Sequence, residues 1–262
     1  MKRIAVILTV AALVISLVGC MVEPHLLETE PVTTSTVTDT IESSSESSVP
    51  PTVPTEPSEP ETVPTEPPTE PSRPVPEPED DDFVRILDYV PNALQSLPYA
   101  TNDNFTGQVI YEFSDAYLRY GAVKKLAAAA TELEAMGFGL LIWDGYRPVY
   151  AQAKLYDVCP DPTYVSPPGV GSQTHCRGRA VDLTLYDLDT GEVLEMPTGF
   201  DDFSALADRN YSDVSVEAAA NARVLEDVMT KHGFKGYSAE WWHYTDTDNY
   251  PIEEEFDPAK VA

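Results

Sequence analysis

The segment from residue 21 to residue 82 most constrains what this chain can fold into. Thr, Ser, Pro and Glu dominate it, 14 of the 24 prolines lie between Pro24 and Pro78, and no aromatic residue precedes Phe83. Such a composition cannot bury enough apolar surface to offset the entropy that is lost on ordering. We therefore predict that the folded part is confined to residues 83–262, about 180 residues, which suits one domain.

Residues 1–20 have the pattern of a secretory signal. Two basic residues precede an apolar run over residues 4–18, which is short for a membrane span. The sequence Leu17-Val18-Gly19-Cys20 then resembles the bacterial lipobox, in which the cysteine is lipidated. We predict an exported lipoprotein that is anchored to the cell membrane through Cys20, since several acyl chains anchor stably. The alternative is an uncleaved signal anchor with an incidental cysteine.

We interpret residues 21–82 as a disordered stalk. Spaced prolines favour polyproline II, and 16 Asp and Glu residues against the single Arg73 extend the chain further by repulsion. At about 3.1 Å per residue the segment reaches at most roughly 190 Å. It would lift the domain away from the membrane, into or through the cell wall. The alternative is a disordered tail without a spacing role.

The charge of the chain excludes two classes of protein. The sequence has 16 Lys and Arg against 44 Asp and Glu, a formal net charge of −28. Nucleic-acid binding depends on clustered basic residues, so we expect no nucleic-acid partner. The one long apolar run is N-terminal, which excludes a polytopic membrane protein.

Periodicity predicts a single α+β domain with a mainly antiparallel sheet flanked by helices. The predicted helices cover residues 115–137, 149–158 and 215–232, the first because Ala122, Leu126, Ala129, Leu133 and Met136 recur at helical spacing. The predicted strands cover residues 139–143, 180–186 and 240–245, with a turn at 189–191 leading into a short further strand. Asp182, Thr184 and Tyr186 form a polar face of the second strand. Helices combined with hairpin-connected strands favour this fold class.

Two histidines and an aspartate form a candidate metal site. His175 precedes Asp182 in a loop that leads into a strand, and His243 lies in Glu240-Trp-Trp-His243. Two imidazoles and one carboxylate make a set of three ligands that leaves a fourth position open, as in catalytic zinc sites. Zinc would lower the pKa of a bound water and polarise a carbonyl. Each residue alone is more often structural, so spacing by itself leaves this choice open.

A hydrolase also needs a base and a positive partner for a tetrahedral intermediate. Glu240, three residues before His243, is the candidate base. Residues three apart in a regular strand point to opposite faces, so the segment must twist, bulge or begin at Glu240. Arg147, in a loop just past a strand, is the candidate for stabilising the intermediate, with Asp144 to orient it.

Four segments, in order along the chain, resemble the zinc D-Ala-D-Ala dipeptidases, the family of the vancomycin-resistance dipeptidase. They are Tyr99-Ala-Thr-Asn-Asp-Asn-Phe-Thr-Gly107, Gly139-Leu-Leu-Ile-Trp-Asp-Gly-Tyr-Arg-Pro148, Arg179-Ala-Val-Asp-Leu-Thr-Leu-Tyr186 and Tyr237-Ser-Ala-Glu-Trp-Trp-His-Tyr244. The resemblance implies the fold that these peptidases share with the hedgehog signalling domain. It also implies the roles of five residues, with His175, Asp182 and His243 as zinc ligands, Glu240 as catalytic base and Arg147 as stabiliser of the intermediate. The implied reaction is the hydrolysis of free D-Ala-D-Ala to two D-alanines.

Two features depart from the family pattern. The family usually has serine two residues before the first zinc histidine, where this chain has Gln173, which puts fine specificity in question but not hydrolysis. The resistance enzymes of the family work on a cytoplasmic pool, whereas we predict that this chain is exported. We therefore expect hydrolysis outside the membrane, of a dipeptide or a peptide released from or trimmed near peptidoglycan.

Once Cys20 is assigned to the lipid, Cys159 and Cys176 remain. An oxidising exterior permits a disulfide between them, and because Cys176 adjoins His175 such a bond would also hold the metal loop. We predict this disulfide. The alternative, Cys176 as a zinc ligand, is disfavoured because adjacent residues rarely reach one ion together.

Three other functions stay open from the sequence. A D,D-carboxypeptidase with the same zinc architecture would trim wall peptides, whereas a dipeptidase should reject N-acylated D-Ala-D-Ala. A non-catalytic, zinc-stabilised wall-binding module would need neither Glu240 nor Arg147. Only the predicted stalk favours a third function, that of a surface adhesin. The sequence leaves the oligomeric state open.

Overall fold

The computed structural model describes residues 77–90, 92–162 and 164–261. The predicted signal and the predicted stalk as far as residue 76 lie outside these described residues. In the described part of the chain, no helix is both long enough and apolar enough to cross a membrane.

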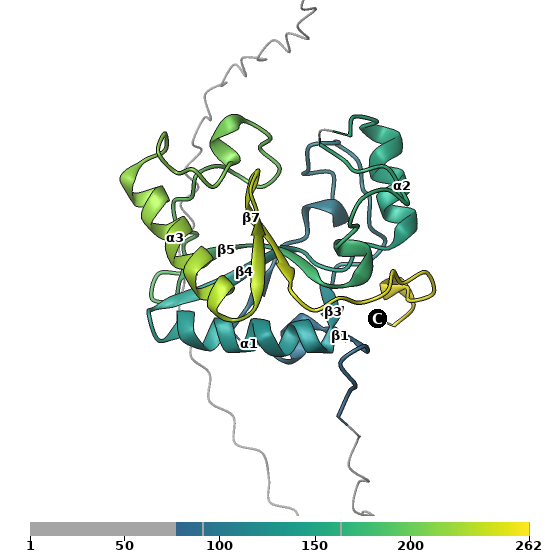
Figure 1. Ribbon diagram of the computed structural model, residues 1–262, viewed down its shortest axis with the longest axis horizontal. Helices are drawn as coiled ribbons and strands as arrows, with labels where there is room; N and C mark the ends of the chain where they lie inside the picture. Colours follow the sequence, from purple (N-terminus) through teal and green to yellow (C-terminus); the bar gives the residue numbers. More distant parts are fainter. Residues whose placement is uncertain (1–76, 91, 163, 262) are drawn as a thin grey trace, which may run out of the picture. The chain divides into compact units, whose positions relative to one another are not determined.

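A five-stranded sheet forms the centre of the described domain (Figure 1). Its strand order is β2 (Leu94–Gln95), β4 (Phe138–Asp144), β5 (Ala180–Asp187), β7 (Glu240–Asp246) and β6 (Phe234–Tyr237). Within it β2 runs parallel to β4, and the other neighbouring strands pair antiparallel. A separate antiparallel pair joins β1 (Phe83–Arg85) to β3 (Tyr117–Arg119).

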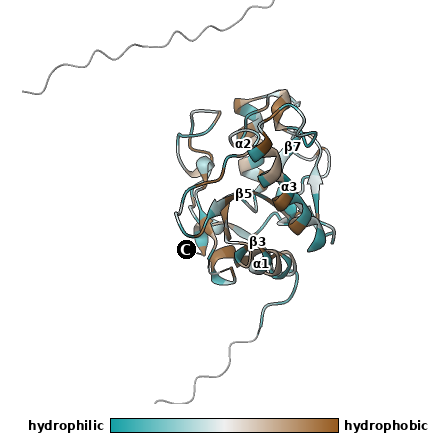
Figure 2. Ribbon diagram, turned by 90° about the vertical axis from the view of Figure 1, so that its left-hand side faces the viewer, coloured by the Kyte–Doolittle hydropathy of each residue, from teal (hydrophilic) through white to brown (hydrophobic). Residues whose placement is uncertain are grey.

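Three α-helices of the described chain accompany the sheet. α1 (Tyr120–Glu134) and α3 (Val216–Lys231) pack against each other and against the sheet. α2 (Val149–Val158) lies at the opposite end of the domain from α1 in both views (Figures 1 and 2). The predicted fold class, α+β with a mainly antiparallel sheet flanked by helices, is confirmed.

The first predicted helix is correct in its interior and wrong at its ends. Ala122, Leu126, Ala129 and Leu133 are fully buried, as their helical spacing predicts. The helix starts only at Tyr120, because the preceding residues form β3 and pair with β1. It ends at Glu134, so Met136 lies beyond it and is 49% exposed, while Gly137 turns the chain with a φ of 90°.

The predicted polar face of β5 is present but is not solvated. Asp182, Thr184 and Tyr186 are 3%, 0% and 8% exposed, because β5 lies in the middle of the sheet. The predicted turn after β5 is also present, with Gly191 at a φ of 75°. The strand expected to follow it is reduced to a single bridge between Tyr186 and Val193.

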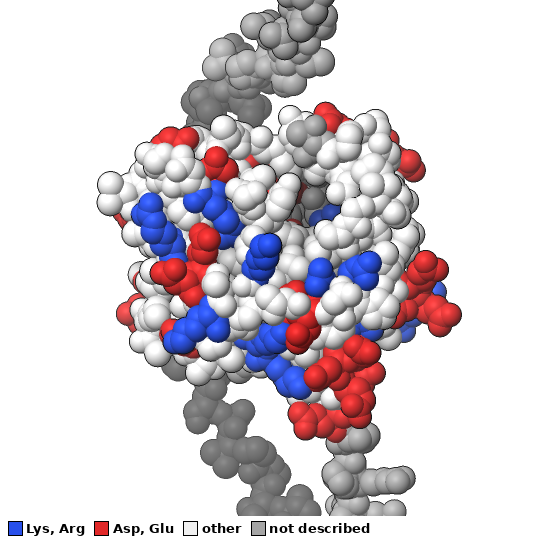
Figure 3. Space-filling model, in the orientation of Figure 1, with Lys and Arg blue, Asp and Glu red and all other residues white. Residues whose placement is uncertain are grey.

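Charged side chains are mixed on the face shown in Figure 3. Lys and Arg are interspersed there with Asp and Glu, and no extended basic surface is visible on this face.

Candidate active site

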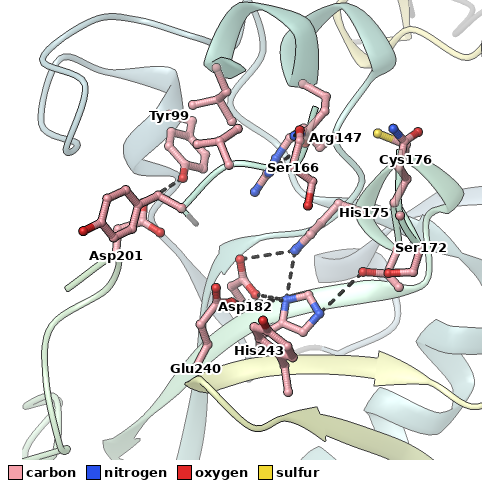
Figure 4. Close-up of a pocket in the computed structure, with 18 of the residues that line it drawn as sticks. Tyr99, Arg147, Ser166, Ser172, His175, Cys176, Asp182, Asp201, Glu240 and His243 are labelled. Carbon is pink, nitrogen blue, oxygen red and sulfur yellow. Dashed lines mark hydrogen bonds and ion pairs between the residues drawn. The ribbon is translucent and has the colours of Figure 1, made fainter. Parts of the chain in front are cut away.

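The predicted site residues meet in one pocket of about 310 Å³, at the lower end of the range of about 300–1,000 Å³ for small-molecule sites. All five line it: His175, Asp182, His243, Glu240 and Arg147. Figure 4 shows the two imidazoles and the aspartate pointing toward one another, with Glu240 beside them. The pocket therefore joins segments that lie far apart along the chain.

Sheet register brings the three candidate ligands together. Asp182 on β5 and His243 on β7 lie directly opposite each other in the antiparallel pairing. His175 comes from the 3₁₀ turn immediately before β5, which ends at Gly178 with a φ of 67°. A Cβ at position 178 would lie 2.3 Å from the Phe83 ring. This turn therefore needs glycine both for its left-handed φ and for lack of space. The ligand atoms of the three side chains all lie within 4.8 Å of one another.

Each imidazole is oriented through its second nitrogen. His175 Nδ1 donates to the carbonyl of Gly145 at 2.7 Å, which leaves the lone pair on Nε2 facing the other ligands. His243 Nε2 lies 3.0 Å from the hydroxyl of Thr245, and His243 Nδ1 faces inward. Hydrogen bonds outside the ligand group thus select the nitrogen that each ring presents.

The spacing of these donor atoms fits a zinc ion. His175 Nε2 is 3.2 Å from His243 Nδ1 and 3.4 Å from Asp182 Oδ2, and His243 Nδ1 is 2.9 Å from Asp182 Oδ1. Tetrahedral zinc with bonds of about 2.0–2.2 Å separates its ligand atoms by about 3.3–3.6 Å. Without a metal, protons link these closely spaced atoms, and a zinc ion that binds them replaces those protons.

The charge state of the aspartate suits metal binding. Burial raises the pKa of the Asp182 carboxyl, but His175 and His243 outweigh burial and lower it overall. Burial lowers the pKa of His175, and Asp182 together with Asp144 more than reverses this effect. The group therefore holds an ionised carboxylate beside two imidazoles, which is a nitrogen and oxygen donor set that zinc accepts.

Glu240 reaches the same site as His243, although three positions separate them. Its Oε2 is 3.9 Å from His243 Nδ1. β7 begins at Glu240. Gly236 of β6 pairs with Tyr244 of β7, but the next residue of β6, Tyr237, pairs with Glu240, so one position on β6 matches four positions on β7. This irregularity is the departure from a regular strand that the spacing requires. Burial raises the pKa of the Glu240 carboxyl above its ordinary value.

Arg209, which the sequence analysis missed, holds this irregular segment. Its guanidinium donates to the backbone carbonyls of Tyr237, Trp241 and His243 at 2.8, 2.9 and 2.9 Å. A Cβ at Gly236 would lie 2.3 Å from Arg209 Cζ, so the arginine also needs this glycine. A single basic residue in a loop carries no sequence signal for such a role.

Replacing Arg209 with lysine should lower the free energy of unfolding by about 2–3 kcal/mol, because buried carbonyls lose their partners. Lysine keeps the charge, but its ammonium group cannot span three carbonyls as the planar guanidinium does. Urea denaturation followed by tryptophan fluorescence measures the change. The matched control is Arg223→Lys at an exposed position of α3, and equal stability of the two variants would contradict the assignment.

Arg147 lies in the pocket and is held by a buried carboxylate. Asp144 Oδ2 accepts from Arg147 Nη2 at 2.7 Å and from Nε at 3.2 Å, so the predicted contact between these residues is confirmed. Asp144 is fully buried and also accepts from the hydroxyl of Tyr111 at 2.7 Å. Burial lowers the pKa of Arg147, but Asp144, Tyr111 and Tyr99 outweigh it and raise the pKa overall. The guanidinium therefore carries its charge into the pocket.

A family profile described as D-Ala-D-Ala dipeptidase matches residues 79–261, which include this whole site. The chain belongs to the D-Ala-D-Ala dipeptidase family. It is similar to three D-alanyl-D-alanine dipeptidases: that of Escherichia coli (strain K12) is 40% identical over 164 residues, 62% of this chain and 84% of the relative. That of Enterococcus faecium is 36% identical over 173 residues (58% and 86%), and that of Streptomyces coelicolor is 36% identical over 187 residues (63% and 91%).

The overall similarity to solved structures is lower. The LdcB LD-carboxypeptidase aligns with a TM-score of 0.35 and 20% identity, covering 58% of this chain and 67% of that one. The vancomycin-resistance D,D-pentapeptidase VanY, solved with Zn(II), aligns with a TM-score of 0.33 and 17% identity, covering 51% and 74%. The family match and the His–Asp–His group confirm the predicted family, the predicted zinc cofactor and the class of enzyme.

Two further residues that line this pocket, Tyr99 and Asp201, received no role from the sequence. The hydroxyl of Tyr99 donates to Asp201 Oδ2 at 2.7 Å. Burial raises the pKa of the Asp201 carboxyl to about 7. Asp201 also has a left-handed φ of 55°, which is uncommon for a residue with a side chain. The available signal was an acidic pair between aromatic residues in Phe200-Asp-Asp-Phe203.

The predicted disulfide is wrong, because Cys159 and Cys176 are both free. Cys176 is 1% exposed beside His175, and burial raises the pKa of its thiol to about 11. Cys159 packs separately against the core at the end of α2. Cys176 is also not part of the metal-binding group, as the sequence analysis expected.

Proposed function

We propose that this chain hydrolyses D-Ala-D-Ala to two D-alanines with a zinc ion held by His175, Asp182 and His243. The observation that carries the proposal is the convergence of these ligands, Glu240 and Arg147 in one small pocket. Zinc, when bound, supplies a Lewis acid that polarises the scissile carbonyl and lowers the pKa of water. The chain's own residues supply the base, the positive charge and the contacts that select the substrate.

Glu240 acts as the general base in this proposal. Its carboxylate lies 3.9 Å from a ligand nitrogen of His243, within reach of a water molecule beside the metal group. It takes the proton of the attacking water and later delivers it to the departing amino group. Burial raises its pKa toward neutrality, and a base transfers protons best when its pKa is near the working pH.

Arg147 stabilises the negative charge that develops on the carbonyl oxygen. Asp144 and Tyr111 hold its guanidinium, so the charge is oriented before the substrate arrives. A donor that needs no reorganisation lowers the barrier more than a mobile one.

Asp201 supports a dipeptidase rather than a carboxypeptidase. A free dipeptide carries an ammonium group, which the end of a wall peptide lacks. In this pocket the Asp201 carboxylate, held by Tyr99, is a suitable partner for that ammonium. An N-acylated substrate has no ammonium and therefore gains no ion pair with Asp201, which opposes its binding relative to the free dipeptide.

A comparison of substrates tests the proposed function. The full chain with zinc is incubated with D-Ala-D-Ala, N-acetyl-D-Ala-D-Ala and a longer peptide that ends in D-Ala-D-Ala, and released D-alanine is measured. We expect release from the free dipeptide alone. Equal release from the acylated substrate would favour the D,D-carboxypeptidase instead, and no release from any substrate would favour a non-catalytic module.

Asp201→Asn should stabilise the fold above neutral pH and weaken dipeptide binding. Between about pH 4 and pH 7 the folded chain keeps a proton on Asp201 that the unfolded chain has released, so stability falls as the pH rises through this window. The variant removes that loss. Its free energy of unfolding should therefore exceed that of the wild type by up to about 4 kcal/mol at pH 8, and the difference should vanish near pH 4. Its KM should rise because the ammonium loses its charged partner.

Urea denaturation at three pH values, about 4, 6 and 8, measures this difference in stability. Asp202→Asn serves as the matched control, because Asp202 is the exposed neighbouring aspartate and does not line the pocket. A constant difference between Asp201→Asn and the wild type across the three values would contradict the prediction.

We also infer that the enzyme works outside the membrane, anchored by lipid at Cys20. The basic pair, the apolar run over residues 4–18 and the lipobox-like sequence support this location, as does the stalk composition of residues 21–82. The substrate there would be a D,D-dipeptide or a peptide derived from peptidoglycan. Cell fractionation tests the inference: the wild type should sediment with membranes and incorporate labelled fatty acid, and Cys20→Ala should do neither. Unlabelled wild type in the cytosol would overturn it.

A further inference from the structure

Gln152 is a buried polar residue that the proposed mechanism leaves without a role. It lies on α2, is 6% exposed and lines the pocket. A buried carboxamide is costly unless both of its ends find partners. Both do: Oε1 accepts from Arg147 Nη1 at 2.9 Å, and Nε2 donates to the carbonyl of Ser166 at 2.7 Å.

The contact with Gln152 completes the set of groups that hold Arg147. A guanidinium has five N–H groups. Nε is shared between Asp144 and Tyr111, one hydrogen of Nη2 goes to Asp144, and one hydrogen of Nη1 goes to Gln152. One hydrogen on each terminal nitrogen is therefore left for a substrate oxygen. The Tyr99 ring also lies against the guanidinium, with its centroid 5.3 Å from Cζ, but without Gln152 all of the hydrogen bonds that hold it would lie on the Nε–Nη2 side and Nη1 would lose its partner.

The other end of Gln152 reaches the pocket loop, which we define as residues 164–174. Ser166, Gly171, Ser172, Gln173 and Thr174 of this loop line the pocket. The loop lacks regular secondary structure, so its position depends on a few specific contacts. One of them is the hydrogen bond that the Ser166 carbonyl accepts from Gln152. A single side chain thus connects the pocket loop to the guanidinium of Arg147.

We propose that Gln152 is a positioning residue that aims the guanidinium of Arg147 at the reacting carbonyl and ties the pocket loop to it. This inference rests on the proposed function, because it assigns Arg147 to the transition state. Orientation of a charged donor matters most where charge develops, so losing Gln152 should act on kcat more than on KM. Gln152 itself does not touch the reacting atoms in this proposal.

Steady-state kinetics of the full chain with zinc test the proposal. Gln152→Leu, which is close in shape and lacks both hydrogen bonds, should lower kcat by roughly ten- to hundredfold and raise KM by the same smaller factor as Gln152→Glu, because both variants release the loop. Gln152→Glu keeps the acceptor for Arg147 but offers no donor to the Ser166 carbonyl. It should retain kcat and raise KM, because only the loop is released.

Gln95→Leu is the matched control. Gln95 also bridges separate groups, accepting from the N–H of Ala116 at 3.1 Å and donating to the Ser114 carbonyl at 3.0 Å and to Asp115 Oδ1 at 2.8 Å, but it does not line the pocket. This variant should leave both kinetic constants unchanged. When Arg147 is already replaced by lysine, adding Gln152→Leu should lower kcat by less than about a further twofold, because the guanidinium that Gln152 positions is gone. Full additivity of the two changes would overturn the proposal.

A readout that does not depend on activity separates this inference from the proposed function. NMR of the chain labelled at its arginine nitrogens should show Nη protons of Arg147 that exchange slowly with solvent, assigned by their loss in Arg147→Lys. Gln152→Leu should make them exchange faster, whereas Gln95→Leu should not. Unchanged exchange in Gln152→Leu would overturn the positioning role. If the wild type hydrolyses no dipeptide, the proposed function is wrong. The NMR result would then decide by itself whether Gln152 positions Arg147.

Discussion

Changing Glu240 to glutamine is expected to lower kcat for D-Ala-D-Ala by roughly 10²–10⁴-fold, the usual contribution of a general base. Glutamine has nearly the same shape but cannot accept the proton of the attacking water. The substrate and the zinc ion should still bind, because Glu240 is not one of the three residues in the metal-binding group. The expected signature is therefore a loss in kcat with KM and zinc content unchanged.

Release of D-alanine and zinc content, measured on the same preparations, check this prediction. Glu192→Gln, at an exposed position in the turn after β5, is the matched control and should behave like the wild type. Full activity in Glu240→Gln would show that another group is the base. Loss of zinc together with activity would instead show that Glu240 supports the metal and not the proton transfer.

Removal of zinc is expected to abolish hydrolysis and to destabilise the fold, and added zinc should restore both. His175 Nε2 and His243 Nδ1 lie 3.2 Å apart, and zinc would replace the protons that link these ligand atoms when no cation is bound. A ligand that binds only the folded state at a thousandfold excess over its Kd stabilises it by about 4 kcal/mol. Mg²⁺ should not replace zinc, because it prefers oxygen ligands in an octahedral arrangement.

Thermal unfolding with and without zinc, together with the rate of D-alanine release, checks this expectation. His243→Ala should lose both the activity and the stabilisation by zinc. His232→Ala is the matched control, since His232 Nε2 pairs with Glu132 at 2.7 Å and takes no part in the metal group. Equal stabilisation of the two variants by zinc would place the ion elsewhere.

Local sequence patterns predicted the interiors of the long elements better than their ends. The helical spacing from Ala122 to Leu133 and the apolar run of β4 both correspond to observed elements. The patterns missed β1, β2, β3 and β6, which are two to four residues long. Such short strands are defined by their partners: residues 117–119 become β3 because β1 pairs with them, and no local periodicity records a partner more than 30 positions away.

The disulfide prediction failed for a related reason. Two cysteines in a chain that is predicted to be exported are compatible with a bond, but compatibility says nothing about their packing. Cys176 is buried beside His175, and Cys159 packs at the end of α2, each among its own neighbours. Only the folded chain decides whether two thiols can meet.

By itself the sequence determined the chemistry that this protein can carry. It identified two imidazoles, a carboxylate, a base and an arginine, since the donor and proton-transfer properties of a side chain belong to the residue type. The tertiary structure decided which of them act together. The pairing of Asp182 with His243, the irregular strand held by Arg209 and the placing of Asp201 in the pocket all depend on contacts between distant segments. Residues far apart in the sequence come within a few ångströms of one another through strand register and packing, and local sequence patterns do not reveal either.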